Sequence, residues 1–341
     1  MMSADNRCIV VAEIGPNHNG DFEEACRLVK SAAQAGADAV KFQYRRADLE
    51  IADRSTASYY FDMPRYDFIK SFQEFSHQQH SDLRALTKSL NLKYIVSAMT
   101  DEVIDAIREL EPDAIKIPSG EVNNPWLVEA SSKLGIPVII SSGMSSDAEL
   151  DEAVKLALSN THDLMVLHCL SEYPTQLEDM NLKVIPRLAA RYNLPVGLSD
   201  HSRRILPVAT SVCYGARMIE VHFTHDRNAI GPDHQVSLTP EELKELVDLV
   251  RLFEISGGSE VRRLGVHSDS MRTSFTNGIV AAKGIKKGVV ITKDDLCLRK
   301  PNKGLGVAAL NVVLGSTASK NIEAGEYLSE DNVVVGGGED D

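Results

Sequence analysis

Two histidines stand at the ends of two successive apolar segments, within the stretch GLSDHS…RMIEVHFT of residues 197–224. Both segments read as strands, and neighbouring strands lie about 4.8 Å apart, so His201 and His222 are expected to reach one cation. Glu220 shares a strand face with His222, because alternate residues point the same way, and Asp233 follows in the turn GPDH. Such a set suits a catalytic divalent metal with open positions for substrate. The competing interpretation is a pair of hydrogen-bonded core histidines.

Two lysines occupy otherwise apolar strand segments, Lys41 in DAVKFQ and Lys116 in DAIKIPS. A buried ammonium group needs an anion beside it. One interpretation pairs each lysine with an internal acid such as Glu13 or Glu121. The other gives the lysines an anionic substrate, since the neighbouring serines and backbone turns also suit a phosphate or carboxylate. Further polar candidates at the same strand ends are Gln43, Ser119, Ser141, Ser171, Tyr173 and Ser199.

The elements that would position these residues alternate regularly between short β-branched segments and segments of helical periodicity. The sequence predicts eight strands, each followed by a helix, at residues 9–15, 38–43, 93–98, 113–119, 136–143, 163–169, 194–200 and 217–224. This pattern predicts an α/β fold, a (β/α)8 TIM barrel of about 250 residues with its chemistry at the carboxyl ends of the strands. The runner-up, a doubly wound open sheet, lacks a glycine-rich dinucleotide fingerprint.

Two segments between the strands are singled out by their residue patterns. The stretch 44–78 is rich in aromatic residues and is expected to be irregular, with a helix following at 81–90. Loops of that length are usually functional or mobile. The segment 239–256 predicts a strong helix, because Thr239 is placed to cap it and Pro240 follows at its first position.

Composition restricts the class of protein. The chain has 341 residues, 43% of them hydrophobic and 25% charged, with a formal net charge of −13, which argues against nucleic acid or an anionic membrane as a partner. Its five cysteines are scattered and form no CxxC pair, so neither a disulfide framework nor a zinc ribbon is indicated. No apolar run reaches transmembrane length and no secretory signal pattern opens the chain. We therefore expect a reduced, cytoplasmic protein.

The periodic pattern ends near residue 256. The polar, glycine- and serine-containing segment 257–272 reads as a linker. Short β-rich pieces separated by Gly-Lys turns then predict a small second domain at 273–335, followed by a tail at 336–341. The catalytic barrel is assigned to residues 1–256.

Several motifs together resemble the sialic acid synthase family. They are AEIGPNHNG, DAVKFQ, KIPSGEVNNP, ISSGM, EYPT, GLSDHS, IEVHFT and GPDH, and GIVAAKGIKKGVVITKDDL resembles the family's antifreeze-like (SAF) domain. The resemblance covers nearly the whole chain. It implies condensation of phosphoenolpyruvate with an N-acylated amino sugar, typically N-acetylmannosamine, to a nonulosonic acid with release of phosphate. It also implies a homodimer in which each SAF domain covers the partner's barrel.

The resemblance also implies residue roles. A divalent metal, usually manganese with magnesium or cobalt as alternatives, sits on the positions of His201 and His222. The family's phosphoenolpyruvate ligands match Lys41, Lys116, Ser119, Ser141 and Ser199. Sugar contacts or the water at the metal match Glu13, Gln43, Tyr173 and Asp233. The capping residues expected from the SAF domain are Phe275, Arg299 and Lys300. Glu13 and Glu121 are the candidate acid/base residues, and Glu220 or Asp233 orients the attacking water.

Three positions depart from the family pattern. Ser97-Ala98-Met99-Thr100 replaces a Ser-Thr-Pro-Phe run, which puts one hydroxyl contact to phosphate in doubt. Lys300 precedes Pro301 where the family usually has Arg, so the bidentate fork is lost. Ser171 stands where many members have Asn beside the sugar, which leaves open a legionaminic or other nonulosonate synthase.

Other classes of protein are also weighed. Ser-His-Asp hydrolysis fits poorly, because Asp200 and His201 are adjacent and the chain has no GxSxG elbow. A metal-dependent pyruvate lyase would share the metal and lysine sites but release pyruvate. A carbohydrate-binding protein would have no use for two buried lysines and a two-histidine site.

Overall fold

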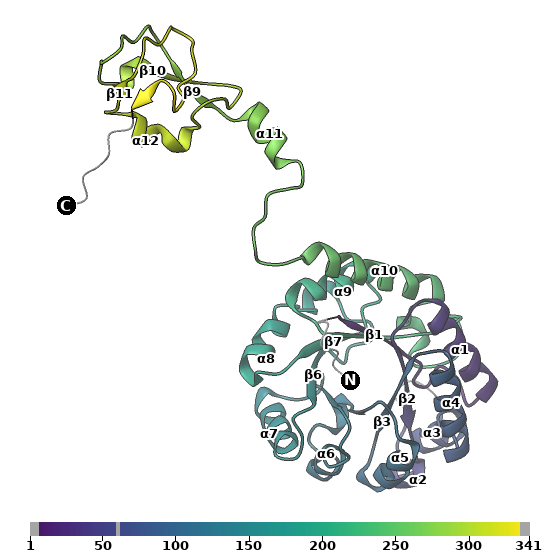
Figure 1. Ribbon diagram of the computed structural model, residues 1–341. Helices are drawn as coiled ribbons and strands as arrows, with labels where there is room; N and C mark the ends of the chain where they lie inside the picture. Colours follow the sequence, from purple (N-terminus) through teal and green to yellow (C-terminus); the bar gives the residue numbers. More distant parts are fainter. Residues whose placement is uncertain (1–6, 59–61, 335–341) are drawn as a thin grey trace. The chain divides into compact units, whose positions relative to one another are not determined.

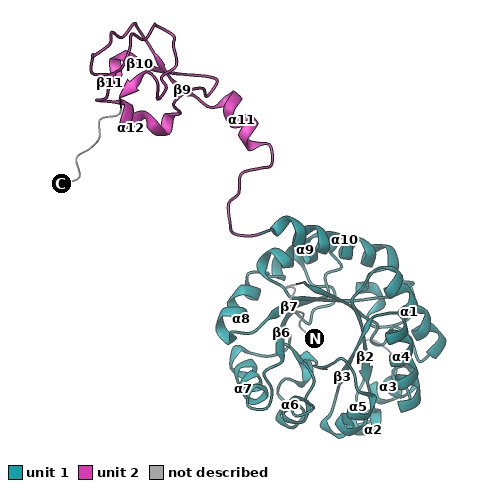
Figure 2. Ribbon diagram, viewed as in Figure 1, with its two compact units in different colours: residues 1–258 teal, residues 259–341 magenta. Residues whose placement is uncertain are grey.

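The computed structural model describes residues 7–58 and 62–334. The chain divides into two compact units, residues 1–258 and residues 259–341, which are coloured separately in Figure 2. Each unit has its own apolar core. The first unit is a closed barrel of parallel strands ringed by helices (Figure 1), as the alternating pattern predicted.

Within the described ranges, the barrel has eight strands that pair in sequence order, with β1 closing against β8. They are β1 Ile9–Glu13, β2 Ala39–Tyr44, β3 Lys93–Ala98, β4 Ala114–Ile117, β5 Val138–Ser141, β6 Leu164–Cys169, β7 Val196–Asp200 and β8 Met218–His222. Each of them overlaps the segment expected from the sequence. Their β-branched and apolar residues pack on both faces, against the helices outside and against one another inside.

The helices lie outside the strands and follow them in alternation. Those of the barrel are α1 Phe22–Gln34, α4 His77–Ser89, α5 Ile104–Leu110, α6 Pro125–Ser132, α7 Asp147–Leu158, α8 Val184–Tyr192, α9 Ile205–Thr210 and α10 Pro240–Gly257. Capping boxes begin three of them, at Ser76 for α4, Ser146 for α7 and Thr239 for α10. The expected Thr239 cap with Pro240 in the first turn is confirmed.

The segment 44–78 is less irregular than its sequence predicts. It contains α2 Ala47–Glu50 and α3 Arg65–Phe72, and α4 begins at His77 rather than at residue 81. Apolar periodicity does not mark the start of α4, because its first turn, HQQH, is polar. The sequence signal for this start is the capping box that Ser76 forms with Gln79. Part of the aromatic run in this segment, residues 59–61, lies outside the described residues.

The interior of the barrel is layered. An apolar cluster, which includes Ile9, Val11 and Met218, fills the end where the strands begin. Alternation then places polar side chains above it, so β8 rises inward from Met218 through Glu220 to His222. This order puts the polar residues at the carboxyl end of the barrel.

The second unit is small and β-rich. Its elements are α11 Ser268–Phe275, β9 Gly278–Ala281, β10 Leu296–Arg299, α12 Leu310–Val313, β11 Thr317–Ala318 and β12 Val333–Val334. β9 pairs antiparallel with β10, and β11 with β12. Nine apolar residues form its core, among them Ile279, Ile291 and Leu328. Helix α11 begins inside the segment that its sequence suggested was linker only.

Candidate active site

Two lysines and two glutamates form a cluster of opposite charges inside the barrel. Lys41 Nζ lies 2.6 Å from Glu13 Oε2 and 3.7 Å from Glu220 Oε1, and Lys116 Nζ lies 2.5 Å from Glu220 Oε1. All four side chains are buried. Strand register explains the contact, because Glu13 is level with Lys41 across β1 and β2. The interpretation that internal acids pair with the lysines is therefore correct for this structure, although Glu220 rather than Glu121 takes Lys116.

The charges control one another's protonation. Burial acts against the ammonium of Lys41, but Glu13 and Glu220 outweigh it and raise its pKa. Burial acts against the carboxylate of Glu220, but the two ammonium groups hold its pKa at about 2. Burial lowers the pKa of Lys116, and the neighbouring Lys41 adds to the effect. Two ammonium and two carboxylate charges therefore cancel within the cluster.

Hydroxyl and amide groups surround these charges. Lys41 Nζ donates to Ser97 Oγ at 3.0 Å, and Ser199 Oγ donates to Glu220 Oε1 at 3.2 Å. Gln43 Nε2 donates to Glu13 Oε1 at 3.1 Å. Ser97 belongs to the segment that departs from the family pattern, yet its hydroxyl is buried beside a lysine. The sequence analysis noted Ser97 only as part of that segment, and its contact with Lys41 is what places it beside the cluster.

Arg45 is a functional candidate that sequence reasoning missed. Its side chain is 11% exposed and forms an ion pair with Glu50, whose side chain is 6% exposed. Arg45 Nη1 also donates to Gln43 Oε1 at 3.4 Å. Because Gln43 in turn contacts Glu13, Arg45 fixes the direction of the Gln43 amide. The signal in the sequence was the position of Arg45, two residues after Gln43 and just past the end of β2.

The two histidines lie together, as expected. The ring centroids of His201 and His222 are 5.3 Å apart, and both side chains are buried. Burial lowers the pKa of His201 to about 3 and that of His222 to about 4, so both imidazoles are neutral near pH 7. His201 Nδ1 lies 2.6 Å from the Leu170 carbonyl oxygen, which makes Nδ1 the donor and leaves Nε2 with its lone pair.

The donor set fits a divalent metal ion of modest affinity. Within the described part of the chain, His222 Nδ1 is buried without a hydrogen-bond partner, and it lies 3.5 Å from Asp233 Oδ2. An unpaired nitrogen lone pair in such a place is costly unless something coordinates it. Within residues 7–58 and 62–334, no group of three or more His, Cys, Asp or Glu side chains forms a metal site, so the protein itself would supply two imidazoles.

Asp233 and Tyr173 border the histidine pair. Burial raises the pKa of the Asp233 carboxyl to about 6. The Tyr173 ring stacks on His201 with a centroid distance of 4.1 Å. Asp233 therefore replaces Glu220 as the carboxylate nearest the histidines, because Glu220 is committed to the lysines.

The predicted serines Ser119 and Ser141 differ in their hydrogen bonding. Ser119 Oγ accepts from the Gly143 backbone N–H at 3.0 Å and lies 3.6 Å from Cys169 Sγ. A Cβ on Gly143 would lie 2.5 Å from Ser171 Oγ, so only glycine allows these side chains to converge. Ser141 is buried, and its hydroxyl has no hydrogen-bond partner among the described residues. An orphaned hydroxyl at a strand end is suited to a ligand.

Glu121 is the remaining candidate of the barrel. Glu121 is half-buried at the barrel end, and among side chains its hydrogen-bond contact is with Asn124 at 3.5 Å. Burial raises its pKa. Phe275, Arg299 and Lys300 belong to the second unit, where all three are exposed. Phe275 and Lys300 line a cavity of about 470 Å³ within that unit.

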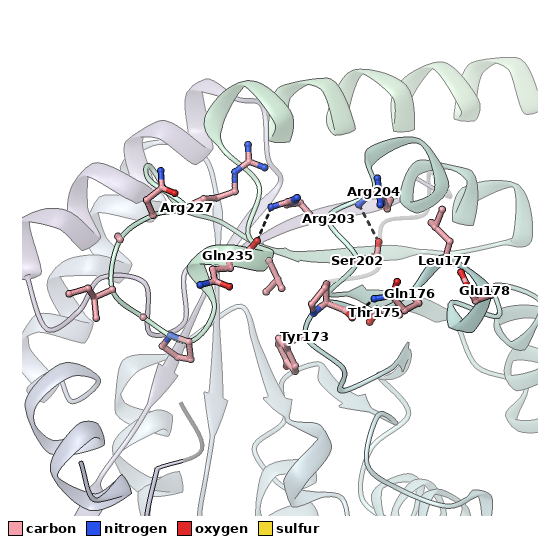
Figure 3. Close-up of a pocket in the computed structure, with 17 residues that line it drawn as sticks. Tyr173, Thr175, Gln176, Leu177, Glu178, Ser202, Arg203, Arg204, Arg227 and Gln235 are labelled. Carbon is pink, nitrogen blue, oxygen red and sulfur yellow. Dashed lines mark hydrogen bonds between the residues drawn. The ribbon is translucent and has the colours of Figure 1, made fainter. Parts of the chain in front are cut away.

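A cavity of about 1020 Å³ opens beside Tyr173, between the loops that follow β6, β7 and β8 (Figure 3). Its lining includes Ser202, Arg203, Arg204 and Arg227. The sequence reasoning did not single out these arginines. Their signal was position alone, since Arg203 and Arg204 follow His201 in the same loop.

The fold and this arrangement of charges define a TIM-barrel protein with a charged cluster at the carboxyl ends of its strands. The chain matches the NeuB family over residues 28–262 and the SAF domain over residues 276–334. The chain belongs to the NeuB family, as its motifs indicated, and the second unit is a SAF domain.

Named relatives agree with this assignment. The chain is 36% identical over 333 residues to N,N'-diacetyllegionaminic acid synthase of Legionella pneumophila, covering 94% of this chain and 93% of that protein. It is 31% identical over 334 residues to human N-acetylneuraminate-9-phosphate synthase, covering 96% and 92%. Among solved structures, the sialic acid synthetase of Leptospira borgpetersenii, in complex with citrate, matches with a TM-score of 0.71 and 29% identity, covering 78% of this chain and 91% of that one.

In the part of the chain that the structure describes, none of the helices combines the length and the apolar character needed to span a bilayer.

Proposed function

We propose that this chain condenses phosphoenolpyruvate with an N-acylated amino sugar, such as N-acetylmannosamine, giving a nonulosonic acid and inorganic phosphate. The observation that carries the proposal is the juxtaposition of two buried lysines with two neutral histidines at one barrel end. Lysines suit the phosphate and carboxylate of phosphoenolpyruvate. The histidines would hold the metal ion that polarises the aldehyde oxygen of the sugar. The named relatives are synthases of related nonulosonic acids.

The barrel residues would supply binding and orientation. In the absence of substrate, the lysine charges are matched by Glu13 and Glu220. Substrate anions would draw Lys41 and Lys116 toward the phosphate and carboxylate, and the free Ser141 hydroxyl would complete the phosphate contacts. A divalent ion on His201 and His222, manganese in the first instance, would supply positive charge and polarise the aldehyde oxygen.

The reaction then proceeds by two additions and one elimination. The enol carbon of phosphoenolpyruvate attacks the sugar aldehyde, and positive charge develops at the carbon that bears the phosphate oxygen. Asp233 takes a proton from water, which adds to that carbon, and this proton passes to the sugar alkoxide. The resulting tetrahedral centre expels phosphate by carbon–oxygen cleavage, and its hydroxyl proton leaves with the phosphate as the keto group forms. Lys41 and Lys116 hold the anionic groups in place throughout, so binding energy is used to orient the nucleophile.

Two further proposals concern assembly and location. We propose a homodimer in which each SAF domain covers the partner's barrel, because Phe275, Arg299 and Lys300 are exposed and the two cations would contact the anionic substrate held there. We also propose a cytoplasmic enzyme. The cysteines at positions 8, 26, 169, 213 and 297 are all free, which suits a reducing compartment.

The substrate pair is tested by incubating the protein with phosphoenolpyruvate, manganese and a panel of N-acylated hexosamines, including the precursors of legionaminic acid. Release of phosphate that requires both substrates is the expected result. Release of pyruvate from a nonulosonic acid, without consumption of phosphoenolpyruvate, would instead identify a lyase. Binding of sugars with no turnover under any condition would identify a carbohydrate-binding protein.

A further inference from the structure

The cavity beside Tyr173 has properties that the proposed chemistry does not use. Its volume of about 1020 Å³ is at the upper end of the range of about 300–1,000 Å³ for small-molecule sites. It lies within the barrel unit, and Tyr173 forms part of its wall while stacking on His201. The cavity therefore adjoins the histidine pair through Tyr173.

The lining of the cavity is strongly cationic in a protein whose net charge is −13. It contains Arg203, Arg204 and Arg227, and Glu178 is its acid. Arg227 donates to Glu242 Oε1 at 2.9 Å, so its charge is partly matched. Among the described residues, no acid lies within salt-bridge distance of Arg203 or of Arg204. Two guanidinium groups therefore remain without a carboxylate partner.

Arg203 is held in place by the turn that also carries His201. Its backbone has φ of +59°, an unusual conformation for a residue with a side chain. Asp200 stabilises the turn by accepting from the Ser202 backbone N–H at 2.9 Å and from the Ser202 hydroxyl at 3.0 Å. Arg203 Nη1 donates to the Gln235 carbonyl oxygen at 3.1 Å, a bond drawn in Figure 3. This leaves its other N–H groups available to a ligand.

We propose that Arg203 and Arg204 form a binding site for a phosphate monoester at the end of the sugar substrate distant from its aldehyde. Planar guanidinium groups bind phosphate oxygens through paired, charge-assisted hydrogen bonds. The inference rests on the proposed condensation, and it narrows the substrate to a phosphorylated acyl-amino sugar. Free phosphate shares this chemistry, and the experiment separates the two sources.

The test compares N-acetylmannosamine with its 6-phosphate under identical phosphoenolpyruvate and manganese concentrations. The full-length protein should turn over the phosphorylated sugar with a kcat/KM at least about tenfold higher. Combined Arg203→Gln and Arg204→Gln substitutions should reduce that ratio by about tenfold, and Arg203→Lys with Arg204→Lys by less. The matched control replaces Arg187 and Arg191 by Gln. These exposed arginines pair with Asp147 and Asp151 elsewhere on the barrel, and their loss should leave the ratio unchanged.

Calorimetric titration without phosphoenolpyruvate supplies a readout that does not depend on turnover. The sugar phosphate should bind more tightly than either the sugar or inorganic phosphate alone. In the double Gln variant, the difference in affinity between the sugar phosphate and the sugar should disappear. Equal kcat/KM for the two sugars would overturn the inference while leaving the condensation intact. A preference that survives the double variant would place the phosphate elsewhere and overturn it too.

Two other results have distinct meanings. Arginine-dependent binding of inorganic phosphate, without preference between the sugars, would overturn the assignment to the sugar and identify a free-phosphate site. Absence of turnover with every sugar would reject the proposed condensation. In that case, arginine-dependent calorimetric binding of the sugar phosphate would still support the site.

Discussion

The candidate residues of the barrel and those of the SAF domain differ in how far the fold has already organised them. In the barrel, Lys41, Lys116 and Glu220 are buried and joined by contacts of 2.5–3.7 Å. In the SAF domain, Phe275 is 64% exposed, and Lys300 is exposed as well. The barrel therefore carries a pre-organised site, whose geometry is fixed by strand register. The SAF residues Phe275, Arg299 and Lys300 are exposed and would need another surface to complete the site proposed for them.

The largest effect is expected from Lys116→Met. Removal of this ammonium deletes a cation that faces the substrate anion and leaves Glu220 with fewer partners, so kcat/KM for phosphoenolpyruvate should fall by about 1,000-fold. The KM for the sugar should change much less. Steady-state kinetics with each substrate varied in turn measures both, and Lys88→Met, at an exposed position of α4, is the control. If only the sugar KM rises, the two substrates have been placed the wrong way round.

Loss of the metal ligands should have the next largest effect. His201→Ala or His222→Ala should reduce activity by at least about 100-fold while circular dichroism shows a folded barrel, since even partners of metal ligands matter 10–100-fold. Chelation should do the same, with recovery on adding manganese, magnesium or cobalt. The control is His162→Ala, at an exposed position before β6. Full activity in chelator would remove the metal from the mechanism.

Arg45→Met tests how far pre-organisation extends beyond the residues that touch substrate. Without Arg45, the Gln43 amide loses the bond that orients it, so the KM for the sugar should rise by about tenfold with a smaller change in kcat. Arg45→Lys should recover part of the effect. Arg54→Met, which breaks an exposed pair with Asp48, is the matched control. An equal loss in both arginine variants would mean that the effect is general destabilisation.

Mixing two inactive proteins tests the role proposed for the SAF domain. One is His201→Ala and the other ends at residue 258, where the barrel with its own core is complete. After subunit exchange, half of the dimers are mixed and one barrel in each is intact and covered, so about a quarter of normal activity should return. If exchange is demonstrated by mass and no activity returns, the SAF domain does not serve the partner's barrel.

The smallest effect concerns stability and involves a buried histidine far from the charged cluster. His80 Nδ1 lies 2.9 Å from the Tyr94 hydroxyl oxygen, and burial lowers the His80 pKa to about 3. Below pH 6.5 the unfolded histidine takes up a proton that the folded one does not, so the native state loses stability as the pH falls. Between pH 7 and pH 5, His80 lowers the free energy of unfolding by about 2 kcal/mol.

Chemical denaturation of the native protein and of His80→Gln at the two pH values measures this term. The variant should be less stable at pH 7, and the difference in free energy of unfolding should shrink by about 2 kcal/mol at pH 5. Comparison of two proteins cancels the contribution of carboxyl groups common to both. An identical difference at the two pH values would show that burial does not lower the His80 pKa in the folded protein.

The sequence alone determined the architecture and much of the site. Alternation of β-branched segments with helical ones was sufficient for the barrel, because each strand must be buried on both faces and each helix on one. Strand periodicity also predicted that Glu220 and His222 share a face, and that His201 and His222 meet. The motifs taken together also indicated the family, which the NeuB family match shows.

Only the tertiary structure decided which side chains contact each other. The sequence offered Glu121 as an acid for the lysines and Glu220 for the metal-site water, yet β8 carries Glu220 inward to Lys116 while Glu121 lies in a short 3-10 helix after β4. Ser97 and Arg203 gained roles because residues distant in the chain contact them. Periodicity fixes the face on which a side chain lies, whereas its partners depend on register, loop path and burial, and these are properties of the assembled barrel.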